Sequence, residues 1–225
     1  MGQMVQFPAN GHSTAGYLAI PSSGSGPGLL VVQEWWGLVE HIKHLCDRFA
    51  TEGFVALAPD LYHGVATKSP DEAGKLFMAL SIARAATDLR SAADSLLGRP
   101  QVTSTKVAAV GFCMGGQLAL YAGAEFPDRI GAVVDFYGIH PNVRIEPSRI
   151  RVPVLAHFGE RDNSVKAADA RTLAAGIEAA GGSIEAHFYP AGHAFFNDSR
   201  PTVYDRGCAE MAWTRTLEFL RKHLA

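Results

Sequence analysis

The chain of 225 residues is 48% apolar and carries 22 acidic against 20 basic side chains, a formal charge of -2. This apolar fraction supports a large buried core, and α/β domains of this length commonly fold as one unit, so we expect a single domain over residues 1–225. The near-neutral balance argues against nucleic acid or anionic lipid as a partner and favours a small molecule.

The N-terminal segment and the cysteines indicate a cellular location. The segment MGQMVQFPAN lacks the basic and apolar regions of a signal peptide, and Gln6 stands where a myristoylation motif has Ser or Thr. No stretch approaches the apolar length that spans a bilayer, so we expect a soluble cytoplasmic protein without membrane contact. Three widely spaced cysteines argue against a disulfide framework, and no His or Cys spacing indicates a metal site: Cys46, Cys113 and Cys208. Neither metal nor cofactor is expected.

Short apolar runs alternate with segments of helical period from Gly28 onward, a pattern typical of a parallel sheet covered on both faces. Before this region, strands at 4–7 and 17–20, separated by Asn10-Gly11, are expected to form an antiparallel hairpin-like edge. The later strands are predicted at 29–33, 54–58, 106–110, 132–136, 154–157 and 184–188. The sequence therefore predicts an α/β fold with a mixed, mostly parallel sheet of about eight strands.

Helices are predicted between these strands. An explicit helix start lies at Ser69-Pro70-Asp71-Glu72, which combines an N-cap serine, a proline at the first helical position and a capping-box glutamate. Two apolar stripes at helical spacing mark helices that face the core: Ile42, Leu45, Cys46 and Phe49, and Trp213, Leu217, Leu220 and Leu224.

The segment from Val107 to Leu120 is predicted to form a strand, a Gly-x-Cys-x-Gly turn and a helix. In a nucleophile elbow the two glycines, here Gly111 and Gly115, let strand and helix approach closely, and the residue between them is exposed on a strained turn. Cys113 takes that place, and the positive end of the following helix dipole favours a thiolate there. Because a cysteine that only packs at a strand–helix junction would give the same motif, the assignment depends on catalytic partners.

An acid and a base follow later strands in the chain order that this arrangement requires: nucleophile, acid, base. Asp162 lies in the polar loop after the strand at 154–157, and His193 lies in the Pro/Gly loop after the strand at 184–188. Both are expected at the carboxyl edge of the sheet, where ligands bind. Glu160 is the alternative acid. Six other histidines are expected to be packed or solvated: His12, His41, His44, His157, His187 and His223.

Six short segments resemble the dienelactone hydrolase family, and the resemblance runs from Gly28 to the C-terminal helix. The segments are Gln33-Glu-Trp-Trp-Gly37, Ala58-Pro-Asp-Leu-Tyr62, Gly111-Phe-Cys-Met-Gly-Gly116, Phe136-Tyr-Gly138, Gly159-Glu-Arg-Asp162 and Ala191-Gly-His-Ala-Phe195. The resemblance implies an α/β-hydrolase fold without a lid domain, a Cys-His-Asp triad, and hydrolysis of an enol-lactone to an open-chain acid.

The resemblance also implies roles for residues around the triad. Glu34 would keep the resting Cys113 thiol protonated until substrate displaces the carboxylate, a role that charge repulsion permits. A salt-bridged carboxylate at the rim is the alternative for Glu34. The backbone N–H groups of Trp35 and Met114 would form the oxyanion hole. Tyr137 matches a family tyrosine near this hole, and further aromatic residues are candidates for the pocket wall if they do not serve only the core: Trp35, Trp36, Phe77 and Phe195.

Two departures from the family concern the substrate. Family members specific for dienelactone use two arginines to bind the substrate carboxylate, and this chain has Pro70 and Asn197 at those places. Neither residue supplies the planar bidentate fork of arginine. Other cations are alternative partners for a carboxylate, unless they are only solvated surface charges: Arg200, Arg84 and Lys68.

The predicted function is hydrolysis of a small-molecule lactone or activated ester through Cys113, with His193 as the base and Asp162 orienting it. A general carboxylesterase or thioesterase with the same triad is the alternative enzyme. A noncatalytic small-molecule binding protein is the alternative outside enzymes. No particular oligomeric state is predicted.

Overall fold

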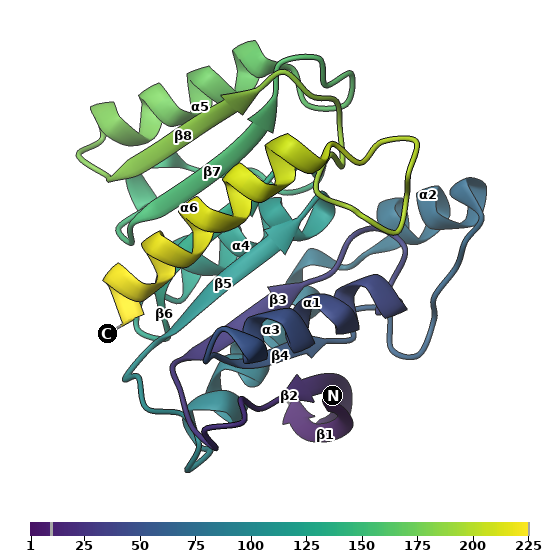
Figure 1. Ribbon diagram of the computed structural model, residues 1–225, viewed down its shortest axis with the longest axis vertical. Coiled ribbons are helices and arrows are strands. Elements are labelled where there is room, and N and C mark those ends of the chain that lie inside the picture. Colours follow the sequence, from purple (N-terminus) through teal and green to yellow (C-terminus); the bar gives the residue numbers. More distant parts are fainter. Residues whose placement is uncertain (10, 225) are drawn as a thin grey trace.

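The computed structural model describes residues 1–9 and 11–224, and one eight-stranded sheet forms its centre (Figure 1). Neighbouring strands follow the order β1-β2-β4-β3-β5-β6-β7-β8. The pairs β1–β2 and β2–β4 are antiparallel, and all other neighbours are parallel. The predicted mixed sheet is therefore confirmed. The strands span Gln3–Ala9 (β1), His12–Ala19 (β2), Gly28–Val32 (β3), Val55–Pro59 (β4), Val107–Phe112 (β5), Ile130–Phe136 (β6), Val154–Gly159 (β7) and Ile184–Tyr189 (β8).

Most predicted strand ends lie within one or two residues of the observed ends, and β2 is the exception. This strand begins at His12 instead of Tyr17, because the residues before Tyr17 lack apolar alternation but still pair in register with β1. Asn10 of the predicted hairpin turn lies outside the described residues. Gly11 of that turn has a φ of 87°, which glycine adopts without steric cost.

Helices cover both faces of the sheet. Leu29 and Val31 of β3 pack in one cluster with buried residues of α1 and α6, whereas Leu30 and Val32 pack in another with α3 and α4. Successive side chains of a strand point to opposite faces, so a continuous apolar run serves both layers. Figure 1 shows α1 and α6 on one side of the sheet and α3 and α4 on the other. The helices span Glu40–Thr51 (α1), Pro70–Ala79 (α2), Ile82–Leu97 (α3), Met114–Glu125 (α4), Ala167–Ala179 (α5) and Arg206–Leu224 (α6).

The predicted start of α2 is confirmed, with one change in its cap. Ser69 is the N-cap, and its hydroxyl accepts a hydrogen bond from the Glu72 N–H at 3.4 Å, while Pro70 is the first helical residue. The Glu72 carboxylate does not return to the Ser69 N–H. Thr67 accepts that N–H at 3.0 Å and donates to Glu72 at 2.6 Å, so a threonine outside the helix completes the cap. Both predicted apolar stripes face the core, although Trp213 is only partly buried.

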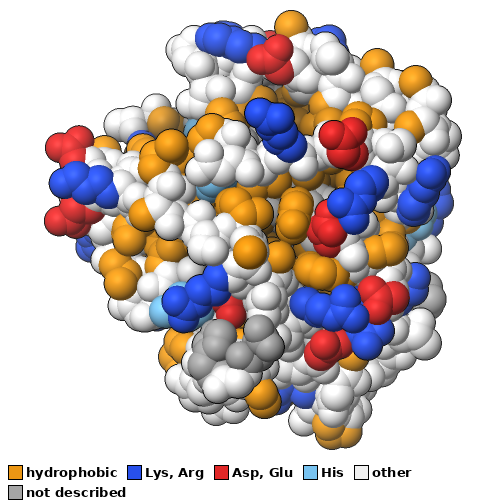
Figure 2. Space-filling view, turned by 180° about the vertical axis from the view of Figure 1, so that it is seen from behind, with side chains coloured by type: hydrophobic (Ala, Val, Ile, Leu, Met, Phe, Trp, Pro, Cys, Tyr) orange, Lys and Arg blue, Asp and Glu red, His pale blue; other side chains and the backbone are white. Residues whose placement is uncertain are grey.

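Charges of both signs are interspersed on the surface. Figure 2 shows acidic and basic side chains side by side on the face opposite to that of Figure 1. Two ion pairs of this kind link α3 and α4 to nearby loops, Arg129–Asp94 and Arg149–Glu125. In the part of the chain that the structure describes, none of the helices has the length and apolar character to traverse a bilayer.

The carboxyl ends of the parallel strands bring distant loops together. The chain passes from β3 to β4 on one side and then returns to β5 on the other, so β3 and β5 are neighbours at a switch point of the sheet. Ligands of open α/β sheets bind in the crevice at such a point. Glu34 follows β3 and Cys113 follows β5, so both lie at this crevice.

Candidate active site

Cys113 lies on a sharp turn between β5 and α4. Its φ of 53° and ψ of -120° are unusual for a residue with a side chain, and backbone hydrogen bonds hold this conformation. Cys113 N–H donates to the Phe136 carbonyl at 2.9 Å, and the Gly116 N–H donates to the Cys113 carbonyl at 3.0 Å. The side chain is mostly buried, since the residue is 9% exposed. The turn thus has the backbone geometry expected of a nucleophile elbow.

Two glycines allow strand and helix to meet at this turn. A Cβ atom on Gly111 would lie 1.9 Å from the Gly115 carbonyl oxygen, and a Cβ atom on Gly115 would lie 2.2 Å from the Val32 carbonyl oxygen. Both distances are far below van der Waals contact, and the obstacles are backbone atoms that cannot rotate away. The predicted reason for glycine at these positions, close approach of strand and helix, is therefore confirmed.

Asp162 and His193 form a hydrogen-bonded pair between the loops after β7 and β8. His193 Nδ1 lies 2.8 Å from Asp162 Oδ2. The other carboxylate oxygen, Oδ1, accepts the N–H groups of Ser164 at 2.7 Å and Val165 at 2.9 Å, which fixes the carboxylate in the loop. The alternative acid, Glu160, pairs with Arg171 at the surface.

Each member of this pair stabilises the charged form of the other. Burial lowers the pKa of His193, but the hydrogen bond to Asp162 and the interaction with the Cys113 side chain outweigh burial and raise the pKa from 6.5 to about 10. Burial raises the pKa of Asp162, but the hydrogen bonds from His193 and the loop amides outweigh it, so the pKa lies below its ordinary value. An imidazolium between a carboxylate and a sulfur is thereby stabilised.

Asp162→Asn is expected to lower the pKa of His193, because the negative charge is lost while burial, which lowers this pKa, remains. The folded-state pKa of about 10 exceeds the ordinary 6.5, so the stability that the pair contributes is complete below about pH 6.5 and is lost as the pH rises through 10. An NMR titration of the His193 ring would measure the shift. Glu160→Gln is the matched control and should leave the titration unchanged; equal titrations in all three proteins would contradict the coupling.

Glu34 is buried beside this pair, with 1% of its surface exposed. Its Oε2 accepts a hydrogen bond from Asn197 Nδ2 at 2.7 Å, whereas its buried Oε1 has no hydrogen-bond partner among the described residues. Burial raises the pKa of Glu34, and attraction to His193, the Asn197 hydrogen bond and attraction to Arg200 offset only part of this effect. Glu34 therefore does not lie at an exposed rim, and its hydrogen-bond partner is a neutral amide.

The N–H groups of Trp35 and Met114, the predicted oxyanion-hole donors, lie after neighbouring strands of the sheet. Trp35 is in the turn after β3, Met114 is the first residue of α4, and Val32 of β3 pairs with Gly111 of β5. Neither N–H donates to another described residue. The first N–H groups of a helix have no acceptor within it, so Met114 is a natural anion-binding donor.

Tyr137 and the pocket-wall candidates Trp36, Phe77 and Phe195 occupy different positions. Tyr137 is fully buried, its ring centroid lies 5.1 Å from that of His193, and its hydroxyl has no hydrogen-bond partner among the described residues. Phe195 is also fully buried and packs on Tyr137 with ring centroids 5.5 Å apart. Trp36 and Phe77 are only partly buried, on the loop after β3 and on α2. The structure thus places Tyr137 beside His193, Phe195 beside Tyr137, and Trp36 and Phe77 nearer the surface.

A cavity of about 460 Å³ is lined in part by Asn197, the hydrogen-bond partner of Glu34. Of the cations considered as carboxylate partners, Arg200 and Lys68 line this cavity, and Arg84 lines a separate one. The guanidinium of Arg200 lies 5.3 Å from the Trp36 ring centroid. The cavity is lined by Trp36, Val39, Glu40, His41, Thr67, Lys68, Asn197, Ser199 and Arg200.

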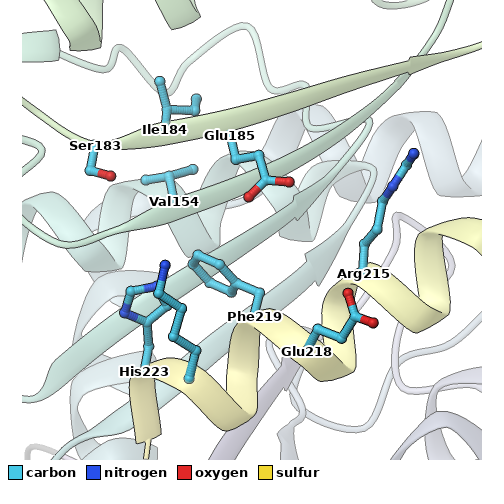
Figure 3. A pocket seen from close by; sticks show the side chains of 9 residues that line it. Val154, Ser183, Ile184, Glu185, Arg215, Glu218, Phe219 and His223 are labelled. Carbon is cyan, nitrogen blue, oxygen red and sulfur yellow. The ribbon is translucent and has the colours of Figure 1, made fainter.

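Another cavity, of about 300 Å³, lies between β7, β8 and α6 (Figure 3). Val154 and Ile184, the first residues of β7 and β8, line it, so it opens at the amino edge of the sheet. Cys113, Asp162 and His193 follow the carboxyl ends of β5, β7 and β8, at the opposite edge. None of the predicted site residues lines this cavity.

Sequence reasoning missed the partner of Glu34. Asn197 was considered only as the place of an absent arginine, but it is 1% exposed and binds the glutamate directly. The two residues are 163 positions apart, so no local spacing links them. Pro70, the other departure, is the first residue of α2 and serves the helix start.

The sheet order, the strained turn at Cys113 and the acid and base on later loops define an α/β-hydrolase-fold protein. Residues 14–224 match the model of the dienelactone hydrolase family. The chain belongs to this family and is a hydrolase.

Individual relatives align with the chain over all or nearly all of their lengths. "Protein usf" of Aquifex pyrophilus is 38% identical and aligns over 100% of both chains. A "Putative carboxymethylenebutenolidase" of Aquifex aeolicus is 37% identical, again over 100% of both chains. Among solved structures, a "Putative Dienelactone Hydrolase" of Klebsiella pneumoniae has a TM-score of 0.87 at 29% identity and covers 98% of both chains.

Proposed function

We propose that this hydrolase cleaves a lactone or activated ester by nucleophilic attack of Cys113. The observation that carries the proposal is the Asp162–His193 pair, hydrogen-bonded at 2.8 Å, whose imidazole interacts with a cysteine on a strained strand–helix turn. Nucleophile, base and orienting acid in one place are what covalent acyl transfer requires.

The reaction proceeds in two steps. Cys113 gives its thiol proton to His193, its Sγ attacks the carbonyl carbon, and the N–H groups of Trp35 and Met114 stabilise the oxyanion. Collapse of the intermediate breaks the bond to the leaving oxygen, which takes a proton from His193, and leaves a thioester on Cys113. Water that gives its proton to His193 then attacks the thioester, and the acid and the thiol are released. Asp162 holds the imidazole in the orientation that both transfers need.

The nucleophile selects among leaving groups. A thiolate leaves a tetrahedral intermediate more readily than a poor alkoxide does, so simple alkyl esters and amides return to substrate. An enolate or aryloxide competes with the thiolate, because its negative charge is already stabilised. Relatives named carboxymethylenebutenolidase fit an enol-lactone substrate, and we extend that class to this chain.

Glu34 acts as a restraint on the thiol in this proposal. Glu34 and Cys113 follow the neighbouring strands β3 and β5, and the charged Glu34 carboxylate opposes a second negative charge beside it, which favours the thiol over the thiolate until the carboxylate moves. Substrate entering the crevice displaces the carboxylate and releases the thiolate. The unpaired Oε1 of Glu34 supports this role, since one carboxylate oxygen is held and the other is not.

The test is rapid-quench mass spectrometry of the intact protein with an enol-lactone or an aryl ester. We expect an acyl adduct that maps to Cys113 and decays at the turnover rate. A noncatalytic binding protein would give no adduct with any substrate. A general esterase or thioesterase would give the adduct with alkyl esters and alkyl thioesters as readily as with enol-lactones, so the substrate panel separates the two enzyme hypotheses.

A further inference from the structure

Asn197 and Glu34 form a buried polar pair at the edge of the crevice. Each is 1% exposed, and Asn197 Nδ2 lies 2.7 Å from Glu34 Oε2. Glu34 follows β3, whereas Asn197 belongs to the loop between His193 and α6. The loop carries the asparagine in a tight turn, because its N–H donates to the Ala194 carbonyl at 2.9 Å and its carbonyl accepts the Arg200 N–H at 3.1 Å.

The orientation of the Asn197 amide follows from its second partner. The Ser199 backbone N–H lies 3.1 Å from Asn197 Oδ1, and the Ser199 hydroxyl lies 2.6 Å from the same atom. A backbone N–H can only donate, so the atom that it meets must be the amide oxygen. The amide nitrogen therefore faces Glu34, and Asn197 can only donate to it.

This donor decides which oxygen of Glu34 is held. Oε2 accepts from Asn197 whether or not the carboxyl is ionised, so a proton on Glu34 belongs on Oε1, which is buried and has no hydrogen-bond partner among the described residues. The charged and titratable groups that act on Glu34 from neighbouring elements are His193, Arg200 and Tyr137. Asn197 itself contributes a hydrogen bond but no charge, so it stabilises the carboxylate without neutralising it.

We propose that Asn197 is a positioning residue that holds the Glu34 carboxylate in its charged form and so sets the pH range in which Glu34 restrains the Cys113 thiol. The inference rests on the restraint by Glu34 in the proposed function. Because Asn197 adds no charge of its own, the restraint depends on whether Glu34 is ionised. Below the pKa of Glu34 the restraint is absent, and above this pKa the carboxylate opposes formation of the Cys113 thiolate.

The experiment measures the alkylation rate of Cys113 by iodoacetamide against pH, followed by peptide mass spectrometry, which needs no knowledge of the substrate. Asn197→Leu keeps the size of the side chain and removes the donor. In this variant we expect the restraint to set in at a pH higher by about one unit or more, because a hydrogen bond to the charged carboxylate is lost. Alkylation between the two onset values should therefore be faster in the variant. Ser199→Ala, which only loosens the amide, should shift the onset the same way by less.

Glu34→Gln tests the role of Asn197 separately from the restraint by Glu34 on which that role rests. This variant should lose the restraint at every pH, and Asn197→Leu added to it should change nothing further. If Glu34→Gln abolishes the restraint but Asn197→Leu and Ser199→Ala leave the onset in place, the role of Asn197 is overturned alone. An equal shift in the Glu34→Gln background would also overturn it, since Asn197 would then act on the fold rather than through Glu34. A restraint that survives Glu34→Gln would overturn both proposals.

Discussion

Cys113→Ala should reduce kcat/KM for an enol-lactone or aryl ester by at least about 10³-fold, because removal of a nucleophile leaves only binding and oxyanion stabilisation. The substitution removes the sulfur but keeps a Cβ atom, so the strained turn with its φ of 53° persists. The Asp162–His193 pair should persist as well, since its hydrogen bond does not involve Cys113. The loss is therefore expected in kcat, with a folded protein.

Cys208→Ala is the matched control for this prediction. Cys208 is a second buried thiol, at the start of α6, and both its backbone N–H and its side chain interact with Asp205, not with the predicted site residues. Its removal should leave the kinetics near those of the wild type. Initial rates over a range of substrate concentrations would measure both variants. Retention of wild-type kcat by Cys113→Ala would exclude the thiol as nucleophile.

The fold and the strained turn at Cys113 could be predicted from the sequence because each depends on local signals. Apolar runs mark buried strands, and the Gly-x-Cys-x-Gly turn constrains a few neighbouring residues. Asp162 and His193 could be assigned because chain order and the carboxyl edge of a parallel sheet bring such loops together. The structure adds the 2.8 Å contact between them, which no sequence pattern states.

The surroundings of Glu34 could not be predicted, because they depend on contacts between distant segments. The loop that carries Asn197 precedes α6 and meets Glu34, 163 positions away in the sequence, only in the folded structure. From the sequence alone, Asn197 indicates only that the arginine which binds the substrate carboxylate in family members is missing. In three dimensions the asparagine is a specific hydrogen-bond donor. The strand prediction for β2 failed for a similar reason, since its first residues are held by pairing with β1 rather than by an apolar pattern.

Gly115→Ala should destabilise the fold by about 3 kcal/mol or more, at the upper end of the cost of inserting a methyl group into a packed site. The new Cβ would lie 2.2 Å from the Val32 carbonyl oxygen and 2.6 Å from that of Gln33. Relief requires α4 to move away from the end of β3, which also separates the Met114 and Trp35 N–H groups. Activity in the folded fraction should therefore fall together with stability.

Gly74→Ala is the control that isolates the steric cause. Gly74 lies within α2, and a Cβ atom there would meet nothing within 4 Å. Alanine favours a helix over glycine by up to about 1 kcal/mol, so this variant should be slightly more stable than the wild type. Urea denaturation would show the midpoints moving in opposite directions with similar slopes. Loss of stability in both variants would show that the glycines matter for some reason other than the close approach of β3 and α4, whereas opposite signs would tie the cost to the atoms that Gly115 faces.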